Sequence, residues 1–210
     1  MLVIGLTGSI GMGKSTTANL FRAAGVAVHD ADLTVHQLYA GRAAPLIEAR
    51  FPGVTEDGVV VREKLAQAVI GNPAAVKELE GIVHPLVRAE EIAYLDRAKA
   101  AGARAVVLDI PLLLETGGEA RVDLILTVTA PSPVQKARVL ARPGMTEAKL
   151  DAILARQVPD AEKRRRAHFL IDTGRGLAAA EAQVDGILKV VAQMSSGTTA
   201  RRPLVSRRPG

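Results

Sequence analysis

The stretch LTGSIGMGKST, residues 6–16, decides the fold. It follows the apolar run LVIGL at 2–6 and leads into a helical pattern from Ser15 to Ala24. Gly8 to Ser15 fits the spacing G-x-x-x-x-G-K-[ST], and a strand before the motif with a helix after it is the context that the motif requires. Glycines let successive backbone N–H groups curl around phosphate oxygens at the N-terminus of the helix. The sequence therefore predicts a nucleotide-binding phosphate loop.

Two side chains of this loop have predicted roles of their own. Lys14 is expected to reach the β- and γ-phosphates, and the Ser15 hydroxyl is expected to ligate Mg²⁺. The residues predicted to bind ATP are Gly8, Gly11, Met12, Gly13, Lys14, Ser15 and Thr16. The alternative is a glycine-rich turn that joins a strand to a helix and binds no ligand, and the match of the motif with both flanks argues against it.

Five short runs rich in Val, Ile and Leu alternate with longer helical patterns. They lie at 2–6, 26–29, 105–109, 124–129 and 168–172. The runs are continuous rather than alternating, which is typical of strands buried on both faces. Strands separated by helices predict an α/β fold with a five-stranded, parallel, doubly wound sheet.

The spacing of these runs is uneven and predicts two insertions. Residues 30–104 separate the second and third runs, far more than the dozen or so residues that a crossover needs. Helices are predicted there over 33–40, 44–50, 62–70 and 74–99, with breaks at FPGVTEDG and GNP. A second insertion, at about 133–166, is dense in charge and holds two or three predicted helices.

Acidic residues follow the second and third runs. Asp30 and Asp32 come just after the second run, and ligands of open α/β sheets bind beyond the carboxyl ends of strands. Asp32 is therefore a candidate catalytic base for the hydroxyl that receives the phosphate. The alternative is that Asp30, or both acids, cap the following helix.

The third run ends in a second kind of acidic motif. In AVVLDIPLLLE, four apolar residues precede Asp109, which is the pattern of a carboxylate that helps to hold Mg²⁺. Buried strands often end in Asp, so the pattern alone is weak. It gains weight because Asp109 is expected to emerge at the same edge of the sheet as Lys14.

Charge and composition disfavour nucleic-acid binding. The net charge is +5, but the tail ARRPLVSRRPG carries four arginines and no acid, so the rest of the chain is nearly neutral. Aromatic residues make up 2% of the chain, too few for a platform on which bases stack. The tail from Ser195 onward is predicted to be disordered.

Other features exclude disulfides and a membrane span. The chain has no cysteine, which is compatible with a cytoplasmic location and removes thiolate metal sites and cysteine nucleophiles. The longest apolar run, AVVLDIPLLL, contains Asp109 and Pro111 and is too short to cross a bilayer. The start of the chain lacks the basic segment of a signal peptide.

Several ordered segments together resemble the dephospho-CoA kinase family, which phosphorylates the ribose 3′-hydroxyl of dephospho-CoA. They span roughly residues 1–190 and are LTGSIGMGKST, DAD at 30–32, VREKL at 61–65, VHPLVR at 83–88, DIPLLLE at 109–115, Gln135, Arg138 and Arg142 in the spacing Q-x-x-R-x-x-x-R, RQ at 156–157, and AHFLIDTG at 167–174. Many families share the phosphate loop. The combination of DIPLLLE, VHPLVR and DAD is much more specific.

The resemblance implies a P-loop NTPase core with a helical substrate domain and a small helical lid. It places the core in 1–40, 100–132 and 167–194, the acceptor domain in 41–99, the lid region in 133–166 and the tail in 195–210. ATP and Mg²⁺ are the implied cofactors and dephospho-CoA the implied acceptor. The implied catalytic residues are Asp32 as base, Lys14, and the lid arginines Arg138 and Arg142, whose charge would offset that of the transferring phosphoryl group. From spacing alone, two arginines four apart on one helix face are as often solvated as catalytic.

The chain departs from the family pattern at three positions of note, Leu114, His168 and Thr173, where Phe, an acid and Asn are usual. The run from Lys163 to Arg166 is predicted to be a charged, solvent-facing helix surface. Pro85 is predicted to open the first turn of a new helix.

Other nucleotide-dependent functions remain as alternatives. Shikimate-type kinases pair a similar loop with D-x-D, but they usually carry a glycine triplet where this chain has DIPLLLE. Adenylate-kinase-like enzymes, which phosphorylate nucleoside monophosphates, usually carry Gly-Thr after the lysine. A guanine-nucleotide switch would need D-x-x-G and N-K-x-D, and neither string occurs. The sequence predicts no oligomeric state.

Overall fold

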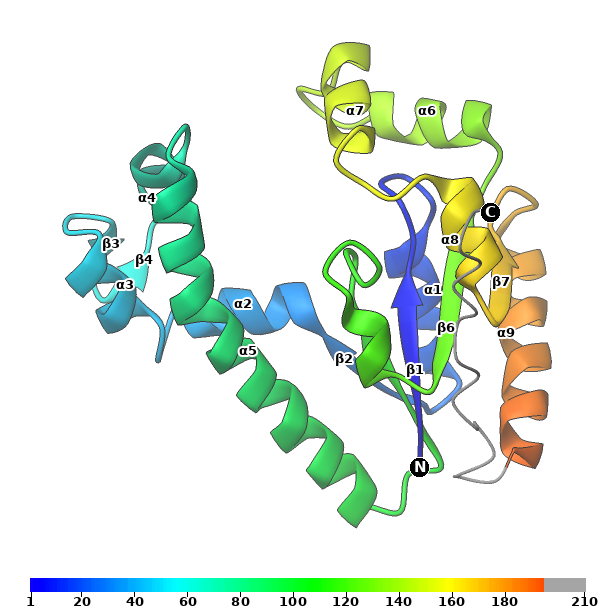
Figure 1. Cartoon of the computed structure of the whole chain (residues 1–210). Coiled ribbons are helices and arrows are strands. Elements are labelled where there is room, and N and C mark those ends of the chain that lie inside the picture. The colour runs from blue at the N-terminus through cyan, green and yellow to red at the C-terminus, as the bar shows by residue number, and fades with distance from the viewer. Residues whose placement is uncertain (195–210) are drawn as a thin grey trace, which may run out of the picture. The chain divides into compact units, whose positions relative to one another are not determined.

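The protein contains one five-stranded sheet with the strand order β2-β5-β1-β6-β7 (Figure 1). The computed structural model describes residues 1–194, so the predicted disordered tail lies outside the described residues. The strands are β1 (Leu2–Thr7), β2 (Ala27–Asp30), β5 (Ala105–Asp109), β6 (Leu124–Thr129) and β7 (Phe169–Asp172). The pairs β1–β5, β1–β6 and β6–β7 are parallel. The predicted α/β fold with a five-stranded parallel sheet is confirmed.

Nine α-helices accompany the sheet within residues 1–194. They are α1 (Lys14–Ala23), α2 (Ala31–Tyr39), α3 (Ala44–Arg50), α4 (Arg62–Val69), α5 (Pro73–Ala100), α6 (Ser132–Leu140), α7 (Glu147–Leu154), α8 (Asp160–Arg166) and α9 (Leu177–Gln193). A 3₁₀ helix, η1, covers Gly118–Arg121. None of the helices in this part of the chain is both long and apolar enough to cross a membrane.

The chain divides into two compact units, each with its own core. The first runs from Met1 to Val28 and resumes at Gly102, and the second runs from His29 to Ala101. The first unit therefore holds the phosphate loop, most of the sheet and helices α6 to α9. The second holds α2 to α5.

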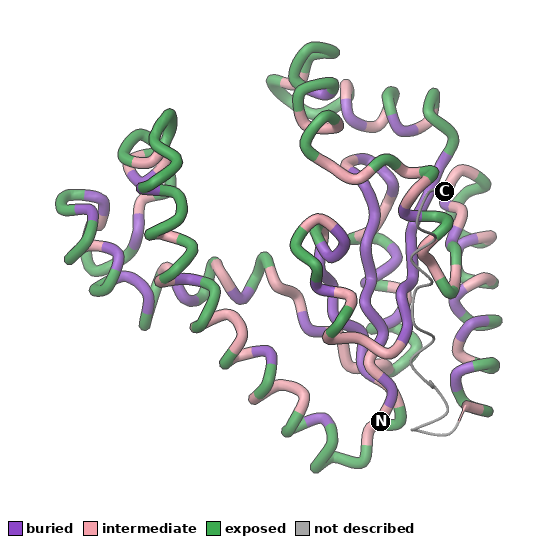
Figure 2. The backbone as a smooth tube through the Cα atoms, in the orientation of Figure 1, coloured by how far each residue is buried: buried purple, intermediate pink, exposed green. Residues whose placement is uncertain are grey.

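One face of the sheet in the first unit is covered by α1 and α9. Because side chains alternate along a strand, Leu2, Ile4 and Leu6 of β1 share this face. They pack with Phe21 of α1 and Val184 of α9, all at most 2% exposed. The central strands β1, β5 and β6 are buried along most of their length, whereas β2 and β7 at the edges are mostly only partly buried (Figure 2). The buried layer fixes the end of β1, from which the phosphate loop departs.

The other face of the sheet is covered by the segment after β5 and by α8. A Cβ atom added at Gly5 of β1 would lie 2.7 Å from Leu113, so the chain after β5 packs directly on this face. Thr127 and Thr129 of β6 also point this way. Their hydroxyls donate to the Lys163 carbonyl at 3.3 Å and to the Asp160 carboxylate at 2.9 Å. Helix α8 is thereby held on the sheet by polar contacts.

A buried ion pair joins α8 to the segment after β5, and it corrects the expectation for the run from Lys163 to Arg166. Lys163 is fully buried, with its ammonium 2.7 Å from Oε1 of Glu115, which also accepts a hydrogen bond from the Val158 N–H at 2.9 Å. Arg166 pairs with Glu119. Only Arg164 and Arg165 of the run are exposed. The prediction of a solvent-facing surface is therefore wrong for Lys163 and Arg166, because an acid from a distant segment meets each of them.

The second unit is a helical assembly in which α2, α3 and α4 contact the long helix α5. Its core includes Leu38, Ile47, Leu65 and Val83. The predicted helices are found within about two residues of their expected bounds. The expectation of a new helix at Pro85 is wrong, because α5 continues through that residue without interruption.

A small hairpin in the second unit was not predicted from the sequence. Strands β3 (Thr55–Glu56) and β4 (Val59–Val60) pair antiparallel across Asp57 and Gly58. Both turn residues have positive φ, 49° and 77°, which is the backbone of a type I′ turn. Asp-Gly is a known hairpin signal, but this segment was predicted only as a break between helices.

We expect Glu115→Gln to destabilise the first unit strongly. Removing one charge leaves the Lys163 ammonium buried without its counter-charge, which costs about 3–5 kcal/mol in comparable sites. The matched control is Glu147→Gln, which breaks the exposed pair between Lys136 and Glu147 and should cost about 0–1 kcal/mol. Thermal unfolding midpoints of the two variants test the difference, and equal shifts would contradict it.

Candidate active site

The phosphate loop adopts a backbone that depends on two glycines. Gly11 and Gly13 have φ of 78° and 90°, in the left-handed region that other residues rarely adopt. A Cβ atom at Gly11 would lie 2.5 Å from Val139, and one at Gly13 would lie 3.0 Å from the Thr173 hydroxyl. Sequence thus fixes both the turn of the loop and its close packing against α6 and the end of β7.

The carbonyl groups of the loop are bound by side chains from other parts of the first unit. The Gln135 side-chain amide donates to the carbonyl of Ile10 at 2.7 Å, and the Thr173 hydroxyl donates to that of Met12 at 2.7 Å. The Arg138 guanidinium lies 3.5 Å from the Gly11 carbonyl. Since the C=O and N–H of a trans peptide point in opposite directions, each bound carbonyl turns the next N–H group the other way.

The first turn of α1 supplies further N–H groups at the end of the loop. The helix begins at Lys14, and Thr17 N–H donates to the Gly13 carbonyl as the first helical hydrogen bond. The N–H groups of Lys14, Ser15 and Thr16 therefore have no acceptor within the helix. Ser15 and Thr16 are exposed. This arrangement is a binding site for an anion at a helix N-terminus.

Met12 differs from the other predicted ATP-binding residues. Its N–H donates to the Ser9 carbonyl at 3.1 Å, and its side chain is 3% exposed. Its sulfur accepts from the Ala130 N–H at 3.1 Å. The structure thus places Met12 as a packing residue that holds the loop on the sheet, and direct contact of Met12 with ATP stays a prediction.

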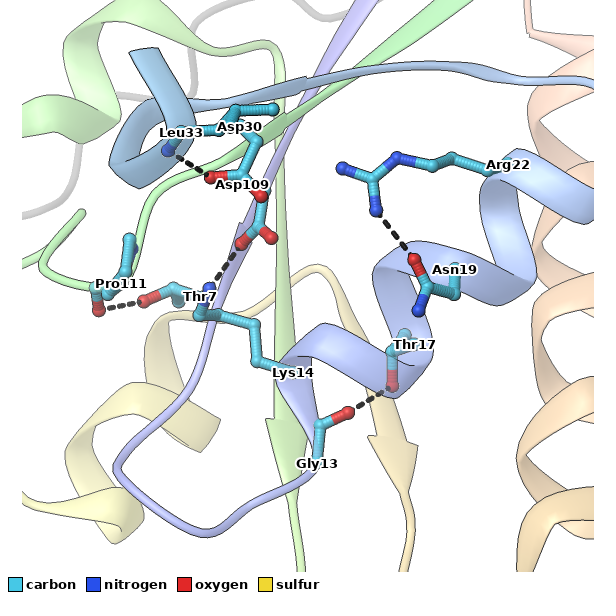
Figure 3. Close-up of polar contacts among 10 residues, drawn as sticks. All are labelled: Thr7, Gly13, Lys14, Thr17, Asn19, Arg22, Asp30, Leu33, Asp109 and Pro111. Atoms are coloured by element: carbon cyan, nitrogen blue, oxygen red, sulfur yellow. Dashed lines mark hydrogen bonds and ion pairs between the residues drawn. The ribbon is translucent and has the colours of Figure 1, made fainter. Parts of the chain in front are cut away.

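Lys14 and Asp109 lie together, as the sequence predicted from the strand ends. The Lys14 ammonium donates to the Asp109 carboxylate at 2.5 Å, and Asp109 is 3% exposed (Figure 3). The segment after Asp109 is fixed by the Thr7 hydroxyl, which donates to the Pro111 carbonyl at 2.9 Å. Asp109 and the loop lysine therefore share one polar site at the carboxyl ends of β1 and β5.

The residues present fit a magnesium ion that is completed by nucleotide and water. Residues 1–194 contain no cluster of three or more His, Cys, Asp or Glu side chains that could hold a metal by themselves. Mg²⁺ in kinases needs less, because it keeps several waters and binds one or two protein oxygens together with phosphate oxygens. Ser15 and Asp109 offer one hydroxyl and one carboxylate, which matches that requirement.

The two acids at the junction of β2 and α2 have different surroundings in the second unit. The Asp30 carboxylate accepts a hydrogen bond from the Leu33 N–H at 2.9 Å and so caps α2 (Figure 3). Asp32 lies in the first turn of α2, is exposed and does not cap the helix. The alternative in which both acids serve only as caps is therefore wrong for Asp32.

Asp32 lines a cavity of about 520 Å³ that belongs wholly to the second unit. The other residues that line it are Val35, Tyr39, Arg62, Leu65, Ala66, Val69 and Leu79. The Arg62 guanidinium lies 5.8 Å from the centre of the Tyr39 ring. Burial raises the pKa of the Tyr39 phenol, and the Arg62 charge partly opposes that shift. The phenol is therefore a neutral hydrogen-bond donor at physiological pH.

The two predicted lid arginines also have different surroundings. The Arg138 guanidinium donates to the hydroxyl and to the carbonyl of Thr173, both at 2.8 Å, besides its approach to Gly11. Arg142 is exposed near the end of α6. Arg138 is thus bound to the back of the phosphate loop, whereas Arg142 remains accessible.

Sequence reasoning missed several residues that hold this site. Thr173 was noted only as a departure from the usual Asn, yet its hydroxyl joins Arg138 to the Met12 carbonyl. Gln135 and Gln157 were noted only as parts of a family pattern, and both bind the backbone of Ile10. The spacing Q-x-x-R-x-x-x-R and the pair RQ at 156–157 were the available signals for these residues. Their partners are backbone groups, which no sequence pattern specifies.

We expect Gly8→Ala to weaken nucleotide binding about tenfold or more. The added Cβ would lie 2.8 Å from the Val128 carbonyl in the buried strand β6, so the loop rather than the strand must shift. The matched control is Gly186→Ala in α9, where the added Cβ meets nothing within 4 Å. The control should keep normal affinity and gain up to about 1 kcal/mol of stability. Calorimetric titration with MgADP measures both affinities, and equal values would refute the steric argument.

Comparison with known proteins agrees with this architecture. A curated relative from Mesorhizobium japonicum named dephospho-CoA kinase is 64% identical over 188 residues, covering 90% of this chain and 95% of that protein. A relative of the same name from Brucella melitensis is 54% identical over 207 residues, covering 99% of this chain and 100% of that protein.

Solved structures show the same fold. The crystal structure of TT1252 from Thermus thermophilus has a TM-score of 0.79 at 34% identity, and the match covers 93% of this chain and 98% of that one. Dephospho-CoA kinase from Campylobacter jejuni has a TM-score of 0.64 at 22% identity, covering 90% and 96% of the two chains, and supports the fold alone. The sequence model of the family described as dephospho-CoA kinase (CoaE) matches residues 2–178. The chain therefore belongs to the dephospho-CoA kinase family.

Proposed function

We propose that this protein transfers the γ-phosphoryl group of ATP to the ribose 3′-hydroxyl of dephospho-CoA, giving coenzyme A and ADP. The observation that carries the proposal is family membership across residues 2–178, at 64% identity to a curated relative of that name. The phosphate loop supports the donor half of the reaction independently. Its carbonyls are bound from outside and the first turn of α1 offers free N–H groups.

In the first unit, Lys14, Ser15 and Asp109 take the donor. The Lys14 ammonium binds β- and γ-phosphate oxygens, exchanging its contact with Asp109 for one with the nucleotide. Ser15 and Asp109 would hold Mg²⁺, directly or through water. The bound ion would supply positive charge against the charge that develops during transfer. Gly8, Gly11, Met12, Gly13 and Thr16 complete the loop around the phosphates.

In the second unit, Asp32 acts as the general base. It accepts the proton of the ribose hydroxyl and orients that oxygen for in-line attack on the phosphorus. Two observations support this role over a structural one. Asp30 already caps α2, and the Asp32 carboxylate faces a cavity large enough for part of the acceptor.

The cavity beside Asp32 receives the acceptor, and its lining combines α2 with helices of the domain proposed at 41–99. Its apolar walls suit a nonpolar face of the acceptor, and Arg62 offers a guanidinium for a phosphate group. Dephospho-CoA carries both kinds of group close to its reacting hydroxyl. The Tyr39 phenol supplies a neutral donor on the same wall.

The two lid arginines have different roles in this proposal. Arg142 is accessible and neutralises the transferring phosphoryl group when the lid region closes. Arg138 contributes by holding the Gly11 end of the loop, through its bonds to Thr173. We place the enzyme in the cytoplasm, where cells keep the supply of ATP that a kinase requires.

An ADP-release assay tests the reaction. Dephospho-CoA, AMP, CMP and shikimate are offered in parallel with MgATP, and only dephospho-CoA is expected to give rapid turnover. The product should be coenzyme A with the new phosphate on the 3′-oxygen, identified by phosphorus NMR. Turnover with shikimate or a nucleoside monophosphate, but not with dephospho-CoA, would overturn the proposal.

For the mechanism, we expect Asp32→Asn to lose at least about a hundredfold in kcat. Affinity for MgADP should stay normal, because the nucleotide binds in the other unit. The matched control is Asp30→Asn, which keeps an oxygen that can cap α2 and should retain most activity. If Asp32→Asn turns over at a near-normal rate, Asp32 is not the base.

A further inference from the structure

Two glutamines bind opposite sides of one residue in the phosphate loop. The Gln135 side-chain nitrogen donates to the Ile10 carbonyl at 2.7 Å, and the Gln157 side-chain oxygen accepts from the Ile10 N–H at 3.2 Å. Gln135 lies in α6, where the chain enters the lid region. Gln157 lies inside the same region, between α7 and α8. The two glutamines thus bind the two successive peptide groups that flank the Ile10 Cα, one as a donor and the other as an acceptor.

The Gln135 contact determines which way the next N–H group points. The Ile10 carbonyl and the Gly11 N–H belong to one planar trans peptide, so they point in opposite directions. Gln135 is 6% exposed and approaches from the packed side of the loop. Holding the Ile10 carbonyl on that side turns the Gly11 N–H toward the side where phosphate binds. Gly11 has a φ of 78° and no side chain to resist a peptide flip, so an external contact is needed.

The Gln157 contact acts on the preceding peptide by the same rule. With the Ile10 N–H directed at Gln157, the Ser9 carbonyl of that peptide points the other way and accepts the Met12 N–H at 3.1 Å. This internal bond closes the loop into a tight turn. Gln157 therefore holds the start of the loop, and Gln135 holds its middle.

We propose that Gln135 and Gln157 are positioning residues for the phosphate loop, which set the direction of its N–H groups before the nucleotide binds. The proposal rests on nucleotide binding by this loop, the donor half of the proposed function. Neither glutamine needs to touch the substrate. Gln135 lies near the start of residues 133–166 and Gln157 lies between α7 and α8, so they also tie two separate parts of the lid region to the loop.

Isosteric variants separate this role from general stabilisation. Gln→Met keeps the length of the side chain and removes its polar atoms at either position. Gln→Glu keeps an accepting oxygen but removes the donor. Because Gln135 donates and Gln157 accepts, the same change has opposite consequences at the two positions.

We expect the MgADP dissociation constants, measured by calorimetry at 150 mM salt, to follow a crossed order. In place of Gln135, Glu should be worse than Met, and in place of Gln157, Met should be worse than Glu. Gln135→Met and Gln157→Met should each weaken binding about fivefold, the size expected for one lost hydrogen bond. Gln135→Glu should be worse than Gln135→Met, because its carboxylate would face the Ile10 carbonyl. Gln157→Glu should stay within about twofold of the wild type, because its oxygen still accepts the Ile10 N–H. In turnover assays the KM for ATP should rise in the three impaired variants and the KM for dephospho-CoA should not.

Asn72→Ala is the matched control for loss of a side-chain bond to the backbone. The Asn72 side-chain oxygen accepts from the Ala75 N–H and so caps α5 in the second unit. Its removal should lower the unfolding midpoint without changing MgADP affinity. The proposal is overturned if Gln157→Glu is as impaired as Gln157→Met. It is also overturned if the Met variants lose thermal stability but bind MgADP normally. If the variants show the crossed order of MgADP affinities but the wild type does not phosphorylate dephospho-CoA, the acceptor assignment fails and this proposal stands.

Discussion

The direction of a few peptide groups is the constraint on which the rest of this site depends. A phosphate loop binds its ligand with N–H groups, so its carbonyls must turn away from the ligand and find donors elsewhere. In this chain the donors for Ile10, Gly11 and Met12 come from Gln135, Arg138 and Thr173. All three donors lie more than a hundred residues later in the sequence. The glycines permit the loop conformation, and these distant side chains select it.

This constraint explains why the end of β7 and the start of α6 meet at the loop. Thr173 follows directly after β7, and its N–H donates to the Thr129 carbonyl at the end of β6. Its hydroxyl then reaches Met12 and accepts from Arg138. Thr173 thus joins the phosphate loop, α6 and the end of β6 in one hydrogen-bond network. Buried networks of this kind hold a unique geometry when every member is paired.

The sheet was predictable from sequence because each of its strands is a continuous apolar run. All five expected runs are strands, and their bounds differ from the predicted ones by only a residue or so. Lys14 and Asp109 were also predictable as neighbours, because parallel strands end at one edge. The role of Asp32 came from family resemblance as much as from its place after β2, and it stays a proposal.

Other features depend on long-range partners that a sequence does not specify. The run from Lys163 to Arg166 has the composition of a solvated face, and Lys163 is buried only because Glu115 reaches it from beyond β5. Pro85 lacks an N–H and is usually a helix breaker, but packing of α5 against three other helices keeps that helix continuous. In both cases the prediction followed the local sequence pattern and was wrong, because tertiary contacts outweighed that pattern.

The residues proposed to act on the phosphates depend on the backbone of the loop. The roles proposed for Lys14, Ser15 and Asp109 require that the loop present its N–H groups to the phosphates, because the lysine and the metal would bind oxygens that the backbone has placed. A side chain that merely holds a carbonyl therefore affects catalysis through geometry. Residues 133–166 contact the loop through Gln135, Arg138 and Gln157, so the segment proposed as the lid is bound to the loop that it is proposed to close over. The hydrogen bonds join the two segments, even though the sequence separates them by more than a hundred residues.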